Sequence, residues 1–416
     1  MSPDRETPSS RAARGPLAGC SWAKRTLVAV LGLALISAGR PIPSTAAPVI
    51  DTPAPGPTRY DYAGLIHLHT NYSDDATGSY DSLAADAGLQ GIRFLIVTDH
   101  NTLQPIRDGR EGWKGGVLML TGIESSRPEG HMLGLNVTSA PTDGDAPTGP
   151  FLSSIQTEGG LAVIAHPTHR KWAWKGPIDD RIMGMEILDL ADQFYDAPAT
   201  AKTAAIAALP FRPMAAYLEL GGRPASALAK WDQITRKRRF VGVYAPDIHQ
   251  AIELSDDWKI PFPPARDIMR IARDHIITRT PFTGRKDVDA PLVYDALRAG
   301  HIFVSLDVLG DGTGFMFAGE RPGQTAWMGD QIAAGPPTTY RVQLPASAAS
   351  LKPIIRLMRN GSEVTRSAPG EAALSWTTSE DGVYRVEVTT RIPTLAGAPR
   401  EMIWIYSNPI YVRAGG

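Results

Sequence analysis

Between residues 62 and about 307, short apolar runs alternate with segments that have the spacing of helices. Strands buried on both faces have such nearly continuous apolar sequences. The predicted strands are residues 64–69, 94–98, 117–122, 132–137, 161–165, 185–190 and 240–244, and the predicted helices include 79–87, 197–208, 225–234 and 265–275. About seven β/α units in this length predict an α/β fold, either a barrel or a doubly wound sheet.

The pattern changes near Leu309. From there to the end, short runs of alternating apolar and polar residues occur at 340–344, 354–358, 384–389 and 403–406. The pairs Asn360-Gly361 and Asp381-Gly382 between such runs are strong turn signals. We therefore predict an α/β domain over residues 60–308 and a small antiparallel β domain over residues 309–416.

The N-terminus has the order of a secretory signal. Basic residues come first, an apolar run follows at 27–38, and small residues stand at 44–47. The apolar run is shorter than the roughly 20 residues of a membrane span. We predict a signal peptide or N-terminal anchor over residues 1–46, a proline-rich linker over 47–59, and a periplasmic or extracellular protein. Contact with a membrane is expected only if the N-terminal segment is retained.

Composition narrows the possible chemistry. The 416 residues carry a net charge of −1, which gives no sign of a nucleic-acid partner. A single cysteine, Cys20, excludes an intramolecular disulfide and a thiolate metal cluster. Any metal ion must therefore be held by nitrogen and oxygen ligands.

Imidazoles and carboxylates collect where the predicted strands end. The set contains His67, His69, Asp74, Asp99, His100, Glu124, His131, His166, His169, Asp247 and His249. Residues two apart on a strand point to the same face, so His67 and His69 can reach one ion. The carboxyl ends of parallel strands open on one face of the fold, where ligands bind. A lone HxH pair would be weak evidence, but this larger set predicts a metal site with imidazole and carboxylate ligands.

These residues also form a series of motifs. They read His67-Leu-His69-Thr70, Ser73-Asp74, Thr98-Asp99-His100-Asn101-Thr102, Gly122-Ile-Glu124, Ala165-His166-Pro167 and Asp247-Ile-His249. In content and order the series resembles the PHP (polymerase and histidinol phosphatase) family. The resemblance implies a distorted (β/α)7 barrel with up to three metal ions. Mixed imidazole and carboxylate ligands suit zinc, manganese and iron alike.

The resemblance also implies how the ligands are shared. The first ion would be bound by His67, His69, Glu124 and Asp247, the second by Glu124, His131 and His166, and the third by Asp74, His100 and His249. Two positions depart from the pattern of many members, which have an acidic residue at Leu65 and a glycine at Asp75. The apolar lead-in at residues 64–66, the export signal and the β domain are more similar to the branch that contains carbaryl hydrolase.

The expected function is hydrolysis of an ester bond in a small molecule. A water that bridges two ions is deprotonated near neutral pH and would act as the nucleophile. Glu124 and Asp247 hold the ions, while His169 is a candidate proton donor and Arg127 a candidate anion contact, although both are also typical of surface loops. A phosphoester substrate is favoured by the family majority, and a carbamate or carboxyl ester by the exported branch. A non-catalytic metal-binding surface module is the remaining alternative.

Overall fold

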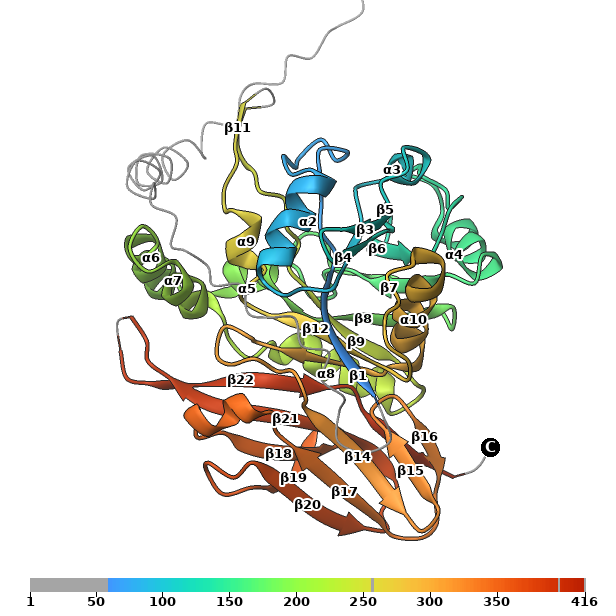
Figure 1. The fold of residues 1–416 in the computed structure, drawn as a ribbon, viewed down its shortest axis with the longest axis vertical. Helices are drawn as coiled ribbons and strands as arrows, with labels where there is room; N and C mark the ends of the chain where they lie inside the picture. Colours follow the sequence, from blue (N-terminus) through green and yellow to red (C-terminus); the bar gives the residue numbers. More distant parts are fainter. Residues whose placement is uncertain (1–58, 256–257, 396, 415–416) are drawn as a thin grey trace, which may run out of the picture.

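The computed structural model describes residues 59–414, apart from 256–257 and 396 (Figure 1). The predicted export segment and nearly all of the predicted linker lie outside the described residues. Within them, no helix has both the length and the apolar character needed to cross a membrane.

Three parallel strands form the first part of the α/β region: β1 (Tyr60–Ile66), β2 (Phe94–Val97) and β4 (Val117–Thr121). The short strand β3 (Gly112–Lys114) runs antiparallel to β4 at the edge. On the other side, β12 (Arg273–Thr278) pairs with β1, and β13 (Ile302–Ser305) pairs with β12, both antiparallel. The first strand therefore lies in the middle of this sheet, with its carboxyl end toward the candidate site.

A second sheet has the order β5 (Ile123–Arg127), β6 (Gly130–Leu135), β7 (Leu161–Ile164), β8 (Ile182–Asp189) and β9 (Val241–Ala245). Isolated bridges link it to the first sheet at Leu68–Ile248 and at His100–Glu124. The strands β5, β6 and β7 are antiparallel, and only β7, β8 and β9 continue in parallel. The fold is mixed α/β as predicted, but the sheets do not confirm the distorted (β/α)7 barrel that the resemblance implies.

Helices cover these sheets and follow several of the strands. They are α2 (Tyr80–Leu89), α3 (Gln104–Arg107), α4 (Thr148–Thr157), α5 (Leu190–Asp196), α6 (Ala199–Ala208), α7 (Pro213–Leu220), α8 (Ala225–Thr235), α9 (Ala265–Ile268) and α10 (Lys286–Ala299). Helix α2 begins at Ser79, whose hydroxyl accepts from the backbone N–H of Ser82 in a capping box. Its buried residues Tyr80, Leu83 and Ala87 recur at the spacing of one helix face.

The predicted helix over residues 265–275 is wrong in its second half. Helix α9 ends at Ile268, and strand β12 begins at Arg273. The apolar residues Ile276 and Ile277 are buried between β1 and β13, and this burial on both sides favours an extended conformation over the local helical spacing.

The C-terminal residues form two further layers of strands, as the alternating pattern predicts. One layer contains β15 (Gln324–Trp327), β14 (Met316–Arg321), β17 (Thr338–Gln343) and β20 (Ala373–Thr378), and the other contains β16 (Gln331–Ala333), β23 (Ile410–Arg413), β21 (Gly382–Ile392), β22 (Arg400–Ser407), β18 (Ile354–Arg359) and β19 (Ser362–Arg366). A 3-10 helix, η1 (Ala346–Ser350), follows β17, and the hairpin β10 (Ile252–Ser255) and β11 (Trp258–Ile260) projects from the α/β region. The predicted turn at Asn360-Gly361 connects β18 to β19.

The two regions share one sheet, because β22 pairs with β13. The boundary near residue 309 therefore separates two patterns of sequence within a continuous hydrogen-bonded structure. The division into domains stays a prediction.

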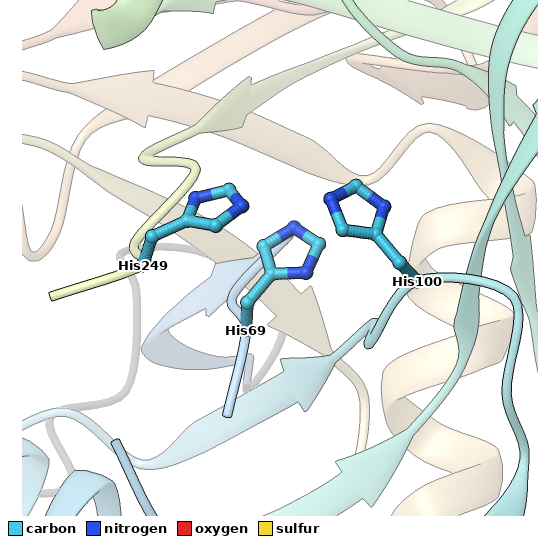
Figure 2. A group of neighbouring side chains, drawn as sticks. All are labelled: His69, His100 and His249. Atoms are coloured by element: carbon cyan, nitrogen blue, oxygen red, sulfur yellow. The ribbon is translucent and has the colours of Figure 1, made fainter. Parts of the chain in front are cut away.

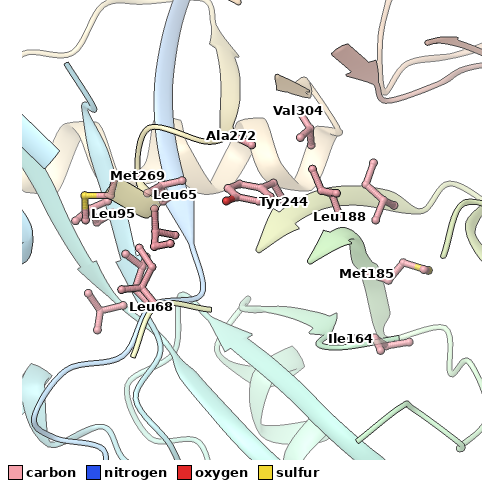
Figure 3. Packing of buried hydrophobic residues seen from close by; sticks show 14 of the residues in the cluster. Leu65, Leu68, Leu95, Ile164, Met185, Leu188, Tyr244, Met269, Ala272 and Val304 are labelled. Atoms are coloured by element: carbon pink, nitrogen blue, oxygen red, sulfur yellow. The ribbon is translucent and has the colours of Figure 1, made fainter. Parts of the chain in front are cut away.

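A large apolar cluster packs between strands of both sheets of the α/β region (Figure 3). Leu65, Leu68 and Leu95 pack on one side of it, and Tyr244 and Leu188 extend it toward β8 and β9. Complete burial of a side chain of this size stabilises a fold by about 1.5–3 kcal/mol, so these residues fix the strand ends relative to one another.

Candidate metal centre

His67 and His69 follow β1 directly. His67 has a φ of 70°, which ends the strand, and Leu68 then pairs with Ile248. The two imidazoles still point to one place: the Nε2 atom of each lies 3.2 Å from Glu124 Oε2 and 3.3 Å from Asp247 Oδ1. The two imidazoles are thus brought together by the left-handed conformation of His67 and by the bridge at Leu68. They do not lie two apart on a continuous strand, as the sequence predicted.

Glu124 lies at the centre of the cluster of imidazoles and carboxylates that forms the candidate site, and it is fully buried. Five imidazole nitrogens surround its carboxylate: those of His67, His69 and His100 lie 3.2, 3.2 and 3.0 Å from Oε2, and those of His131 and His166 lie 2.8 and 3.2 Å from Oε1. A carboxylate at this position can contact two ions at once, one through each oxygen. Glu124 would therefore suit a position between two metal ions.

Several of these atoms are buried without a hydrogen-bond partner. Among the described residues they include His67 Nε2, His69 Nε2, His100 Nδ1, Glu124 Oε2 and Asp247 Oδ1. A buried polar atom without a partner is costly, and such atoms are rare in native proteins. Here they converge, and the donor set of imidazole nitrogen and carboxylate oxygen suits zinc, manganese or iron. The residues therefore fit divalent metal ions.

Electrostatics in the cluster favours added positive charge. Burial opposes protonation of His67, but the nearby carboxylates Glu124, Glu186 and Asp247 outweigh it and raise the pKa of His67 well above its usual value. Burial also disfavours the ionised form of Glu124, yet the surrounding imidazoles hold its pKa well below the ordinary range. The same balance between burial and imidazoles lowers the pKa of Asp247. Metal cations would take the place of the protons on these imidazoles and would likewise compensate the buried carboxylates.

A second group of imidazoles lies beside the first group, which consists of His67, Glu124, His166 and Asp247. His69, His100 and His249 present one ring nitrogen each within 4.8 Å of one another (Figure 2). The ring of His69 stacks on that of His249, with a distance of 4.1 Å between centroids. Since His69 Nε2 also contacts Glu124 and Asp247, it lies between the two groups.

The carboxylate beside this second group is Asp75, not Asp74. Asp75 Oδ2 lies 3.2 Å from Nε2 of both His100 and His249, while Asp74 is exposed. A tight turn at Ser73 explains why Asp75, and not Asp74, faces the imidazoles. The N–H of Ser73 donates to Thr70 O, and its carbonyl accepts from the N–H of Ala76. The side chain of Asp75 is 40% exposed, so this carboxylate lies at the solvent side of the group.

Two carboxylates that the sequence analysis did not single out support the imidazoles. Glu186 Oε1 lies 2.6 Å from His67 Nδ1, and Asp189 Oδ2 lies 2.5 Å from His166 Nδ1. Glu186 Oε2 also accepts from the backbone N–H of His166. Each carboxylate holds a proton on Nδ1 and leaves Nε2 free for an ion, as is usual for metal-binding histidines. Two acidic residues within the apolar run of β8 were the signal that could have found them.

Asp99, next to His100, is fully buried and holds neighbouring loops in place. Its Oδ1 accepts from the backbone N–H of Thr70 at 2.6 Å and from the hydroxyl of Ser73 at 3.0 Å. Ser73 Oγ in turn accepts from the backbone N–H of His100 at 2.8 Å. Asp99 thereby ties the loop after His69 to the loop that carries His100.

His169 lies next to the cluster and is 6% exposed. Its Nδ1 accepts from the backbone N–H groups of Lys171 and Trp172, at 3.2 and 3.3 Å. Its neutral form therefore carries the proton on Nε2. The ring stacks on Trp172 with 4.4 Å between centroids, and its centroid lies 6.0 Å from that of His166. Burial and the neighbouring His166 lower the pKa of His169, so it is a neutral hydrogen-bond donor at neutral pH.

Arg127 does not take the predicted role of an anion contact. Its guanidinium donates to the backbone carbonyls of Pro141, Asp143 and Ala146 at 2.9–3.1 Å, and lies 4.1 Å from the ring centroid of Phe151. The side chain is 6% exposed. Three carbonyls that face one point in a loop attract a guanidinium more strongly than open solvent does, so Arg127 fastens this loop.

Backbone strain coincides with the candidate ligands. His67, His166 and Asp247 have φ values of 70°, 46° and 48°, in the left-handed region that non-glycine residues seldom adopt. Each such residue costs on the order of 1–3 kcal/mol and persists where the surroundings fix it. Strain at three neighbouring candidate ligands is typical of a functional site.

Comparison with known proteins gives little beyond this geometry. No protein-family model matches the sequence, and no curated protein matches it. Among solved structures, the chain is similar to a two-domain protein from Bacteroides vulgatus described as containing a predicted PHP-like metal-dependent phosphoesterase, at 11% identity over 85% of this chain and 98% of that one, with a TM-score of 0.43.

Two further structures cover less of the chain. A candidate metal-dependent phosphoesterase from Bifidobacterium adolescentis is 14% identical over 45% of this chain and 87% of its own, with a TM-score of 0.29. An amidohydrolase from Chromobacterium violaceum is 13% identical over 49% and 92%, with a TM-score of 0.26. The first two descriptions name the kind of protein that the sequence motifs resemble. At these scores we base the functional conclusion on the site itself.

Proposed function

We propose that this protein is a metal-dependent hydrolase of ester bonds, with phosphoesters as its substrate class. The observation that carries the proposal is the buried carboxylate of Glu124, contacted by five imidazole nitrogens whose facing atoms are largely without hydrogen-bond partners. A protein that only stored or displayed a metal would not need a carboxylate placed to bridge ions.

Two to three divalent ions would be held by the residues that the cluster brings together. His67, His69, Glu124 and Asp247 would hold the first, Glu124, His131 and His166 the second, and His100, His249 and Asp75 the third. Such ions lower the pKa of a bound water and polarise the oxygen of an ester. We propose zinc, manganese or iron(II), which mixed imidazole and carboxylate ligands suit alike.

The chain's own groups would supply orientation and a hydrogen bond. Glu186 and Asp189 keep the Nε2 atoms of His67 and His166 directed at the centre. His169 would donate from Nε2 to the oxygen of the leaving group, because its Nδ1 is already occupied by two backbone N–H groups. Trp172 packs against the rings of both His131 and His169 and would hold these two side chains in place.

A second candidate is hydrolysis of a carbamate or carboxyl ester. It is favoured by the position of Arg127, whose guanidinium is committed to backbone carbonyls and cannot contact a phosphate. It is also favoured by the aromatic side chains Trp172 and Tyr195 next to His169, which would pack against an apolar ester. Trp174 does not contribute, because it is buried and its Nε1 donates to Pro177 O.

Rates on 4-nitrophenyl phosphate and on a 1-naphthyl carbamate would distinguish the two classes. The protein reconstituted with zinc, manganese or iron(II) is expected to turn over the phosphate, and Glu124→Gln is expected to abolish the reaction. Turnover of the carbamate alone would replace the first class by the second. Failure on both substrates, by a protein that binds its metals, would favour a non-catalytic metal-binding module.

We also propose that residues 1–46 direct export. The support is the order of basic, apolar and small residues in the sequence. Sequencing the N-terminus of protein recovered from the periplasm or medium tests it, with a start near Ala47 as the expected result. Recovery only as an uncleaved chain in the cytoplasm would contradict it.

A further inference from the structure

A cavity of about 420 Å³ lies behind the candidate metal centre. It is enclosed by the carboxyl end of β8, the helices α5 to α8, and Arg400 of β22. His166 separates it from the cluster: Nε2 of this ring lies 3.2 Å from Glu124, while Nδ1 lies 2.5 Å from Asp189, which lines the cavity. The cavity is therefore a place distinct from the one where an ester would meet the ions.

Its wall is rich in carboxylates. The acidic residues that line it are Glu186, Asp189, Asp192, Asp196 and Glu219. The two arginines in the wall already have partners. Arg223 pairs with Glu387 at 2.8 Å, and Arg400 donates to the backbone carbonyl of Leu218 and is attracted by the charge of Glu219. Among the described residues, no lysine or arginine forms an ion pair with Asp192 or Asp196. Glu186 and Asp189 face the imidazoles of His67 and His166, so Asp192 and Asp196 are the wall carboxylates that have no ion pair among the described residues.

Asp192 is the residue that points to a ligand. It is 8% exposed and lines the cavity, and its Oδ1 has no hydrogen-bond partner within the described part of the chain. Its Oδ2 accepts only a long bond of 3.3 Å from the hydroxyl of Thr168. Burial, together with the charges of Asp189 and Glu186, raises the pKa of Asp192 to about 8. A buried carboxylate in this state is one that a cation would stabilise.

We propose that this cavity binds a small organic cation with an ammonium group, and that Asp192 is its anchor. The volume is that of a small-molecule site, which is commonly about 300–1,000 Å³. In this wall, the described side chains close enough to share a metal ion are Glu186 and Asp189 together with His166, whereas Asp192, Asp196 and Glu219 belong to no such group, so a bare metal ion fits less well at Asp192. An ammonium group needs only one or two charged hydrogen bonds and fills the remaining space with its carbon chain.

The position of the cavity gives the ligand a connection to both regions of the protein. Arg400 comes from β22, and Glu387 of β21 holds Arg223 in the wall. On the other side, the backbone N–H of Asp192 donates to Asp189 Oδ1 at 3.1 Å, and Asp189 holds His166. A cation bound here would lie between the β-rich layers and the support of a candidate metal ligand.

Isothermal titration calorimetry with 1,4-diaminobutane tests the proposal, with 1,4-butanediol as an uncharged probe of the same length. The diamine is expected to bind the intact protein with a stoichiometry of one, and the diol is expected not to bind. Asp192→Asn should weaken binding of the diamine about tenfold or more, since a hydrogen bond to a charged group contributes about 1.5–3 kcal/mol. Asp295→Asn, which removes an exposed carboxylate on α10, is the matched control and should leave binding unchanged.

Equal affinity of the Asp192→Asn variant would overturn the proposal, as would equal binding of the diol or no saturable binding of the diamine at about millimolar concentration. Circular dichroism and the metal content of each variant would establish that the fold and the candidate metal centre are intact. The readout is binding rather than turnover, so its result does not depend on the proposed hydrolase activity.

Discussion

At the residue scale, the candidate site depends on a few carboxylates with different surroundings. Glu124 contacts imidazoles through both oxygens, whereas Glu186 and Asp189 contact the far sides of the rings of His67 and His166. Removing Glu124 should lower the number of metal ions bound. Altering Glu186 or Asp189 should lower the affinity for these ions. The two kinds can be separated by measurement.

Asp75 and Asp74 provide a matched pair of adjacent carboxylates. Asp75→Asn should lower the number of ions bound by about one, because Asp75 Oδ2 contacts both His100 and His249. Asp74→Asn should change nothing, since that side chain is exposed. Metal content after dialysis, measured by inductively coupled plasma mass spectrometry, decides between them. A loss of metal in the Asp74 variant with none in the Asp75 variant would restore the assignment that the sequence motif implied.

Glu186→Gln should weaken metal binding without removing a ligand. Outer hydrogen-bond partners of metal-binding histidines typically contribute about 10–100-fold in metal affinity, and Glu186 contacts both His67 Nδ1 and the N–H of His166. Competition with a chelating dye measures the effect, with the exposed Glu363→Gln as the control. An unchanged affinity would mean that Glu186 does not position these rings.

At the element scale, the strand ends were largely predictable from the sequence, and the loops were not. Apolar runs placed His67 and His166 just after strands, because burial on both faces leaves a clear pattern, whereas Glu124 lies in β5, a strand that the sequence did not predict. The choice between Asp74 and Asp75 depends on one turn, and the bond from Arg127 to a distant loop depends on tertiary contacts. Neither leaves a periodic signal in the chain.

Strand β12 shows how tertiary contacts override local spacing. Its residue His275 lies between two carboxylates: Nδ1 is 2.8 Å from Asp61 Oδ1, and Nε2 is 3.3 Å from Asp307 Oδ2. Burial opposes its protonation, but the two carboxylates outweigh burial and raise the pKa of His275 to about 10. The charged ring ties β1 and β12 to the segment that leads into the β-rich layers.

The stabilisation by His275 should depend on pH in a defined direction. Since its pKa rises on folding from 6.5 to about 10, the charged ring stabilises the fold fully below about pH 6.5 and loses this effect as the pH rises toward 10. His275→Gln should therefore lower the free energy of unfolding by about 3 kcal/mol at acidic pH, and by much less near pH 10. Urea unfolding of the intact protein and of His275→Gln across this pH range measures the difference between their free energies of unfolding. A difference that widens with rising pH would contradict a positively charged ring at His275.

At the scale of the whole molecule, the α/β region and the β-rich layers are joined by a sheet and by a buried ion pair. Strand β22 pairs with β13, and Arg385 of β21 donates two hydrogen bonds of 2.8 Å to Asp232 of α8. Arg385 also donates to Glu387 at 2.7 Å, and all three residues are buried. The change in sequence pattern near residue 309 indicates the second region, but not these connections, which join residues far apart in the chain.

Arg385→Met should destabilise the protein by about 3–5 kcal/mol, because buried Asp232 would lose its cation and Glu387 would keep only Arg223. The exposed pair of Arg341 and Glu320 provides the control, and Arg341→Met should change stability by about 1 kcal/mol or less. Chemical denaturation followed by circular dichroism measures both. Equal effects of the two substitutions would show that the buried pair does not join the regions.

The most direct test of the account is the number of metal ions bound by the protein and by Glu124→Ala. After dialysis against zinc, manganese or iron(II), mass spectrometry of the intact protein should find two to three ions per chain. Glu124→Ala should retain at most one, because its carboxylate is shared by both groups of imidazoles. An intact protein that binds no ion, or a variant that binds as many ions as the intact protein, would contradict a metal centre built on Glu124.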